Sequence, residues 1–113
     1  MSVVTLSTFD TQFEQLQTYL EKTPELVVDV ETNGLEWYGF NQICGLGVGE
    51  PTSSGFLQYY PFRHHQGENL TLAHLKQVIE LLNSHVQTYI GYNLKFDAHF
   101  LEKEGVQITD KTL

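Results

Sequence analysis

The chain lacks several features that would place it in common protein classes. Its 113 residues include one cysteine, Cys44, so no internal disulfide can form. No apolar run approaches the roughly 20 residues that a membrane-spanning helix needs, and no signal peptide is evident. We therefore expect a soluble protein in a reducing, cytoplasmic setting, with no membrane partner.

Basic residues are also scarce. Six Lys and Arg stand against fourteen Asp and Glu, which gives a formal net charge of −8. This composition excludes a diffuse basic surface that would hold a phosphate backbone by charge alone. Any work on nucleic acid would have to use divalent cations, which neutralise clustered carboxylates and attract phosphate oxygens. The acidity argues against a simple nucleic-acid-binding module but not against a metal-dependent nuclease.

Nothing divides the chain into separate parts. It has no internal repeat, proline-rich linker or low-complexity stretch, and 41% hydrophobic residues suffice for one modest core. We predict a single α/β domain over residues 1–113. The expected elements are a helix at Asp10–Lys22 with Asp10 as its N-cap, strands at Leu26–Glu31, Asn41–Glu50 and Gly55–Phe62, a helix at Leu70–Asn83, a strand at Thr88–Gly91, a helix at Leu94–Glu104 capped by Asn93 and ended by Gly105, and a strand-like segment at Val106–Ile108.

Two carboxylates on the first long strand are the candidates for chemistry. Asp29 and Glu31 alternate with Leu26, Val28 and Val30, so both acids project from one face and can hold a hard cation. Taken alone, an Asp-x-Glu pair on a strand is more often a solvated face. The surrounding hydrophobic residues indicate a central strand, however, and a buried acidic pair there would need a cation or hydrogen bonds.

A third carboxylate follows a later strand. In the segment 91–97 a strand leads into a helix whose first turn carries Asp97. An acid in that place also has an ordinary explanation, because it interacts favourably with the helix dipole. The two acidic segments together are more specific than either one.

The two segments resemble motifs of a known family. Asp29-Val-Glu-Thr-Asn-Gly-Leu35 is similar to the first motif of the DEDD-superfamily 3′–5′ exonucleases, and Asn93-Leu-Lys-Phe-Asp97 is similar to the second. The second motif and Tyr59-Tyr60-Pro61 most resemble the proofreading domains of family A DNA polymerases. The resemblance implies an α/β fold, a ribonuclease H-like mixed sheet with flanking helices that is C-terminally incomplete. Such a domain would be either cut from a larger polymerase or completed by further sequence or a partner chain.

The third motif of that family is absent from the sequence. It would supply the last metal-binding Asp and a catalytic Tyr or His. Asp110 lies in a segment that resembles the stretch just after the second motif, so we assign it no catalytic role. Because the later helices of the family would cover one face of the sheet, we expect an exposed apolar patch and self-association or marginal stability.

The resemblance also implies a metal site. Two Mg²⁺ or Mn²⁺ ions would lie about 3.5–4 Å apart. Asp29 would bridge them, Glu31 would bind the first, and Asp97 would bind the second largely through water. One ion would activate the attacking water and the other would stabilise the leaving 3′ oxygen, which would release a nucleoside monophosphate.

Three further residues would bind the substrate by the same resemblance. Leu35 would wedge between the last bases, Asn93 would help to place the terminal nucleotide, and the backbone near Thr32 would meet the 3′ hydroxyl. The partner would be a single-stranded or frayed DNA 3′ end, with RNA also possible.

Other eye-catching residues have simpler interpretations. The histidines lack zinc-ligand spacing and are expected at the surface or the edge of the core. They are His64, His65, His74, His85 and His99. Trp37, Tyr38 and Phe40 could stack on bases, but packing beneath their loop is the commoner use of such residues.

Three functions stay open from the sequence. The chain could be a metal-dependent exonuclease module, a metal-binding but catalytically incompetent remnant that binds nucleic-acid ends, or a structural domain whose acidic surface meets a protein. Metal binding by the three acids separates the last from the first two, and only turnover separates the first from the second.

Overall fold

The computed structural model describes residues 2–34, 39–52 and 55–108 as a mixed α/β fold. Its elements in chain order are β1 Ser2–Val3, α1 Phe9–Lys22, β2 Glu25–Thr32, β3 Ile43–Gly49, β4 Leu57–Pro61, α2 Leu72–His85, β5 Thr88–Ile90 and α3 Leu94–Lys103. Among the described residues, none of the helices has the length and apolar character needed to cross a membrane.

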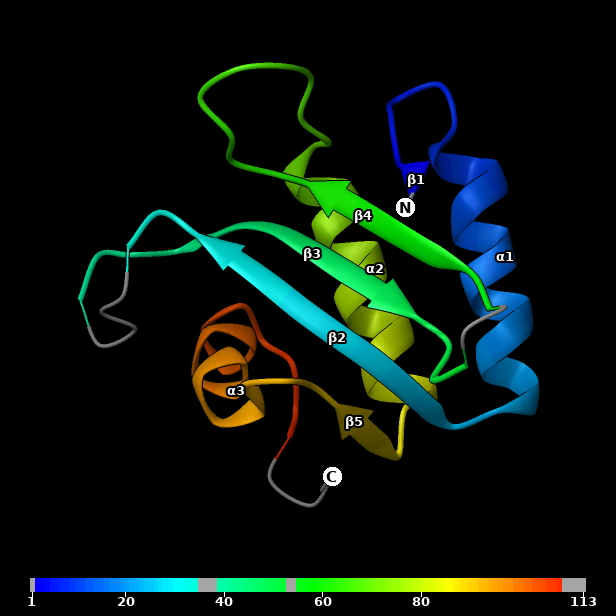
Figure 1. The fold of residues 1–113 in the computed structure, drawn as a ribbon. Helices are drawn as coiled ribbons and strands as arrows, with labels where there is room; N and C mark the ends of the chain where they lie inside the picture. Colours follow the sequence, from blue (N-terminus) through cyan, green and yellow to red (C-terminus); the bar gives the residue numbers. More distant parts are fainter. Residues whose placement is uncertain (1, 35–38, 53–54, 109–113) are drawn as a thin grey trace.

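The five strands form one mixed sheet in the order β1-β4-β3-β2-β5 (Figure 1). The strands β2, β3 and β4 form an antiparallel meander, while β5 runs parallel to β2 and β1 runs parallel to β4. The pairing of β5 with β2 is short and ends at Val27↔Ile90. The outer edge of β2 beyond Val27 therefore has no strand partner in the described fold.

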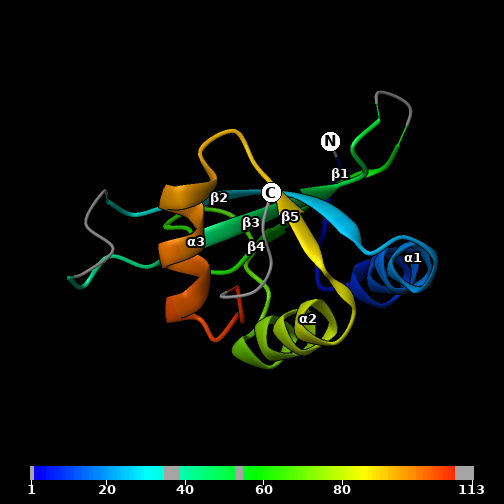
Figure 2. The same cartoon turned by 90° about the horizontal axis from the view of Figure 1, so that it is seen from below.

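The helices cover one face of this sheet. Helices α1 and α2 lie side by side on that face, and α3 stands at the edge next to β2 (Figure 2). The opposite face, called the open face below, has no described helix packed across it. Any side chain that β2 turns away from α1 and α2 is therefore accessible.

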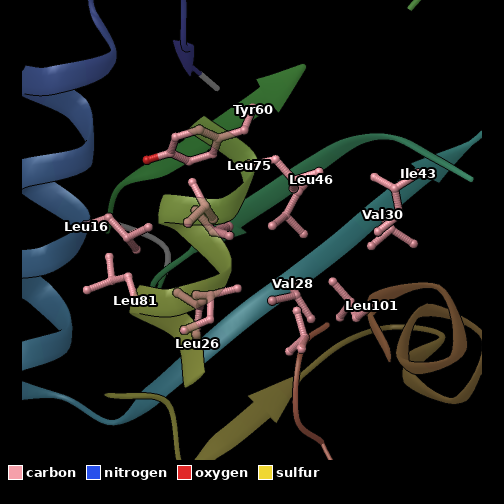
Figure 3. Close-up of a cluster of buried hydrophobic side chains, with 14 of the residues drawn as sticks. Leu16, Leu26, Val28, Val30, Ile43, Leu46, Tyr60, Leu75, Leu81 and Leu101 are labelled. Carbon is pink, nitrogen blue, oxygen red and sulfur yellow. The ribbon is translucent and has the colours of Figure 1, made fainter. Parts of the chain in front are cut away.

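The core lies between the sheet and these helices (Figure 3). Alternate residues of β2 point into it, where they meet leucines from both helices. The labelled core side chains include Leu16, Leu26, Val28, Val30, Leu46, Leu81 and Leu101. Burial of this aliphatic set, at about 25 cal/mol per Å² of apolar surface, is the main force that fixes which face of β2 is inside.

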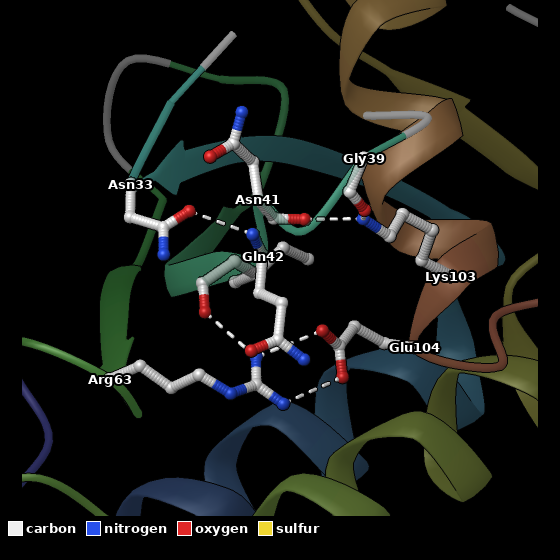
Figure 4. Close-up of polar contacts among 8 residues, drawn as sticks. Asn33, Gly39, Asn41, Gln42, Arg63, Lys103 and Glu104 are labelled. Atoms are coloured by element: carbon white, nitrogen blue, oxygen red, sulfur yellow. Dashed lines mark hydrogen bonds and ion pairs between the residues drawn. The ribbon is translucent and has the colours of Figure 1, made fainter. Parts of the chain in front are cut away.

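The C-terminal end of α3 is tied to the sheet by a partly buried ion pair (Figure 4). The guanidinium of Arg63 donates to both carboxylate oxygens of Glu104, at 2.9 and 3.1 Å, and to the Ile43 carbonyl at 2.8 Å. The exposed fractions of the two charged side chains are 23% and 10%. This bidentate contact holds α3 against the ends of β3 and β4.

Most expected elements are present, but three details were wrong. Asp10 is not the N-cap of α1, because the helix begins at Phe9 after Thr8 and Asp10 lies in its first turn. The segment Val106–Ile108 forms no strand; its backbone leaves α3 through Gly105, whose φ is +104°. The two-residue strand β1 was not foreseen, since a pair of residues carries no readable periodicity.

We predict that Arg63→Met lowers the free energy of unfolding by about 2 kcal/mol, because it leaves the Glu104 carboxylate and the Ile43 carbonyl without their donor. Urea unfolding measures the change. Lys76→Met, at an exposed position on α2, is the matched control. Equal losses in both variants would show that the ion pair contributes nothing.

Candidate nuclease site

The strand β2 carries the first two candidate residues on the open face. Asp29 and Glu31 are exposed, whereas Val28 and Val30 between and before them are buried. The expected alternation is confirmed, but the expectation of a buried acidic pair was wrong. Since α1 and α2 both pack on the other face, water reaches these two carboxylates.

The free edge of β2 brings the third acid to the same place. Helix α3 packs along this edge, and Asp97 in its first turn is 4% exposed. Its carboxylate accepts a hydrogen bond from the backbone N–H of Val30, a group that no described strand satisfies on this side. Asp97 therefore completes the hydrogen bonding of β2 where β5 stops.

Asp97 has a perturbed acidity. Burial, with a further contribution from the negative charge of Asp29, raises the pKa of Asp97 to about 6, although the Val30 N–H opposes the shift. The mutual repulsion shows that Asp29 and Asp97 are electrostatic neighbours across the edge of β2. A raised carboxylate pKa beside a second acid is typical of functional sites, because a bound cation removes the repulsion.

Glu31 makes a contact that the sequence did not predict. The hydroxyl of Tyr59, on β4, donates to Oε2 of Glu31 at 3.2 Å, and the Tyr59 hydroxyl oxygen lies 2.6 Å from Nε2 of His64. Burial and the negative charge of Glu31 raise the pKa of Tyr59, so the phenol stays protonated and remains a donor. Period-2 glycines at 45, 47 and 49 were the only signal that a neighbouring side chain covers this face.

These side chains border a small depression on the open face. Its volume is about 130 Å³, and its lining includes Asp29, Glu31, Gly47 and Tyr59. Gly47 has no side chain to fill the depression beside Asp29, where a Cβ would lie 3.4 Å from the Asp29 carbonyl oxygen. Both acids of the first motif thus face one shallow hollow.

The backbone of Thr32, the proposed 3′-hydroxyl contact, lies at the start of a loop that is held at its base. Asn33 and Gln42 exchange two hydrogen bonds, and the Thr32 hydroxyl donates to the Gly34 carbonyl at 2.5 Å. From α3, the Lys103 ammonium donates to the carbonyls of Gly39 and Asn41 (Figure 4). Leu35, the expected wedge, lies outside the described residues, as do Trp37, Tyr38 and Asp110.

Asn93 stands at the entrance to α3. Its carbonyl accepts the first helical bond from the Asp97 N–H at 3.0 Å, but its side chain makes no capping hydrogen bond and is exposed. Asn93 therefore occupies the expected N-cap position, but its side chain does not cap the helix. Its amide group remains available on the same helical turn as Asp97.

The three acids do not yet converge. Within the described residues, no three His, Cys, Asp or Glu side chains lie close enough together to hold a metal ion as they stand. Glu31 leans toward Tyr59 on the β4 side of β2, whereas Asp97 approaches from the β5 side. The negative charge of Asp29 raises the pKa of Asp97.

Known structures share this arrangement of elements. The RNase domain of the yeast Pop2 protein superposes with a TM-score of 0.58 and 14% identity over 91% of this chain and 57% of its own. The Mg²⁺- and Mn²⁺-bound form of Pop2p from S. pombe gives a TM-score of 0.54 and 10% identity over 91% and 62% of the two chains. At these identities the comparison establishes the fold, which is ribonuclease H-like.

Sequence comparison leads to DNA polymerases. DNA polymerase I of Synechocystis is 26% identical over 107 residues, and DNA polymerase DpoZ of an Acinetobacter phage is 30% identical over 95. The chain therefore resembles DEDD exonucleases in its two motifs and its fold, and part of these DNA polymerases in overall sequence. The two matches cover 94% and 79% of this chain but only 11% and 13% of the polymerases. No family model matches the chain.

We predict that Asp97→Asn stabilises the metal-free domain at pH 8. The amide oxygen can still accept the Val30 N–H, and the repulsion from Asp29 is removed. Because the pKa of Asp97 is raised in the folded state, the wild-type fold has its full stability below pH 4, where Asp97 is protonated in both states. The free energy of unfolding then falls as the pH rises through 6 and Asp97 ionises. The gain of the variant is therefore at most about 3 kcal/mol at pH 8 and shrinks toward pH 4.

Urea unfolding with a chelator at pH 4.5 and 8 measures this gain. Glu102→Gln, at an exposed position of the same helix, is the control and should show no such pH-dependent difference. A variant that is less stable than the wild type at pH 8 would contradict the assignment of Asp97 as a strained, buried carboxylate.

Proposed function

We propose that this domain is a divalent-metal-dependent 3′–5′ exonuclease of the proofreading type, which hydrolyses phosphodiester bonds at nucleic-acid 3′ ends. One observation carries the proposal: α3 packs along the free edge of β2 and brings Asp97 near enough to Asp29 for the charge of Asp29 to raise the pKa of Asp97, and both acids lie in segments that resemble exonuclease motifs. Glu31 projects from the same face of the same strand. The polymerase relatives and the RNase fold are consistent with a nuclease.

The residues fit Mg²⁺ or Mn²⁺. Both ions prefer oxygen ligands, and Asp29, Glu31 and Asp97 offer only carboxylate oxygens. The repulsion that raises the pKa of Asp97 is the interaction that a cation would reverse. When bound, such ions supply Lewis acidity for phosphodiester hydrolysis. We assign Asp29, Glu31 and Asp97 as the metal-binding and catalytic residues, with Asp29 central.

The remaining residues would place the substrate. The exposed amide of Asn93 can donate to the terminal nucleotide. The backbone of Thr32, the last residue of β2, would meet its 3′ hydroxyl. Leu35 would separate the last bases. Since the chain has a formal charge of −8, phosphate attraction depends on the bound cations, which favours short contacts with single-stranded or frayed ends over long duplexes.

A second candidate is a metal-binding but catalytically incompetent remnant that binds nucleic-acid ends without turnover. The arrangement of the acids favours it in one respect, because no three donors converge among the described residues. A polymerase domain in a longer parent chain, or a second copy of the chain, would be its partner. The two candidates differ in turnover and agree on the fold.

Release of mononucleotides from a labelled single strand tests the proposal. With Mn²⁺, the domain should shorten DNA from the 3′ end, and an RNA strand of the same sequence reports the preference for sugar. Asp29→Asn should lower the rate more than about 100-fold, because loss of a ligand exceeds the usual effect of its outer-sphere partners. Glu102→Gln should match the wild type.

Turnover separates the two candidates, and metal binding separates both of them from a purely structural domain. Mn²⁺ should raise the melting temperature of the wild type and not of Asp29→Asn, since a ligand that binds only the folded state stabilises it. Mn²⁺ binding without any mononucleotide release would favour the remnant. Absence of both binding and release would overturn the nuclease proposal.

A further inference from the structure

A chain of hydrogen bonds ends on Glu31. The hydroxyl of Tyr59 contacts Oε2 of Glu31 and Nε2 of His64. An ionised Glu31 has no proton to give, so Tyr59 donates in that bond. The phenol has a single proton, and Nε2–H of His64 must therefore donate to the Tyr59 oxygen. The direction of donation runs from His64 through Tyr59 to the carboxylate.

Gly45 is what allows Tyr59 to reach this carboxylate. Tyr59 lies on β4 and Glu31 on β2, with β3 between them, and Gly45 pairs directly with Glu31. A Cβ at position 45 would lie 1.8 Å from the Tyr59 Oη and 2.2 Å from its Cζ. The ring therefore crosses β3 in the space that a side chain would fill, and any other residue at position 45 would displace it.

His64 is itself held in place. Its backbone N–H donates to Oδ1 of Asn69, and Nδ2 of Asn69 donates to the His64 carbonyl, both at 2.9 Å. The rings of His64 and Tyr59 pack with centroids 5.7 Å apart. Two anchored groups thus fix the position of the Tyr59 hydroxyl, and the hydroxyl restricts Glu31 to a small part of its rotamer range.

The contact leaves Glu31 able to bind a cation. Tyr59 engages one carboxylate oxygen, and a carboxylate offers about four lone-pair sites in all. Asp29, the neighbouring acid on the same face, makes no hydrogen bond to this hydroxyl in the described part of the chain. The restraint is therefore specific to Glu31, the acid with the longer side chain and more rotamers to lose on binding a metal.

We propose that Tyr59, fixed by His64 and admitted by Gly45, is a positioning residue that pre-orients Glu31 for the divalent cation. This inference rests on the proposed metal-dependent function. Partners of this kind orient metal ligands and raise affinity because the ligand's freedom is already restricted before the metal arrives. The protein thereby has a built-in support for one of its three acids.

Tyr59→Phe tests the role most directly. It keeps the ring over Gly45 and removes only the hydroxyl. We expect the dissociation constant for Mn²⁺, measured by electron paramagnetic resonance titration, to rise about 10-fold, the lower end of the range for outer-sphere partners of metal ligands. The kcat of Tyr59→Phe on a single strand should be close to the wild-type value at saturating Mn²⁺ and well below it at low Mn²⁺, because the variant loses affinity for the metal.

The adjacent tyrosine provides the matched control. Tyr60 points to the other face, where its hydroxyl donates to Gln58 at 2.7 Å in the core. Tyr60→Phe also removes one buried phenol hydrogen bond, so it should lower the unfolding free energy without changing the Mn²⁺ dissociation constant. A purely structural role for Tyr59 would give the same pattern as Tyr60→Phe.

Substitution of His64 separates the donor from the ring. His64→Gln offers an amide N–H near the position of Nε2 and should keep the Mn²⁺ affinity within about 3-fold of wild type, whereas His64→Ala should approach the loss seen in Tyr59→Phe. Equal wild-type and Tyr59→Phe affinities would overturn the positioning role and leave the nuclease proposal standing, as would tighter binding by Tyr59→Phe. Failure of the wild type to bind Mn²⁺ would overturn both.

Discussion

The free edge of β2 beyond Val27 is the constraint on which the site depends. Because β5 has only three residues, the backbone of β2 from Val28 onward needs another partner on that side. Helix α3 takes this place, and its Asp97 accepts the Val30 N–H. The same hydrogen bond that completes the strand therefore brings the acid of the second motif beside Asp29. Asp97 thus supports the fold and is also one of the residues proposed to bind the metal.

That shared role is electrostatically costly. Asp97 is 4% exposed and lies near a second acid, so its ionised form is destabilised, and this is why its pKa is raised. Two of the described basic side chains already have other partners, since Arg63 binds Glu104 and Lys103 binds loop carbonyls. A cation from solution would compensate this negative charge, so the charge balance supports the proposed metal site as well as the motifs do.

The sequence was informative wherever a local pattern decides the structure. Alternation along β2 predicted the shared face of Asp29 and Glu31, and the left-handed Gly105 marked the end of α3, because both depend on neighbours in the chain. Burial of Asp97 and exposure of the acidic pair depend on which face the helices cover, which no local pattern encodes. The expected burial was therefore assigned to the wrong acids.

Tyr59 escaped prediction for a related reason. Tyr59 and Glu31 are 28 residues apart in the sequence, and their contact crosses a third strand. The sequence around either residue therefore does not predict the contact. Two consecutive tyrosines on a strand must face opposite sides, however, and here each uses its hydroxyl.

Tyr60 bonds Gln58, whose amide also donates to the Gln12 carbonyl on α1, so this half of the pair fastens the helical layer. Tyr59 reaches across Gly45 to the open face and restrains Glu31. Strand β4 therefore connects the two sides of the sheet through adjacent residues. A shift of β4 that repacked α1 would move the support of Glu31 with it, so the geometry of the acids is coupled to the integrity of the core even though both acids of β2 lie in solvent.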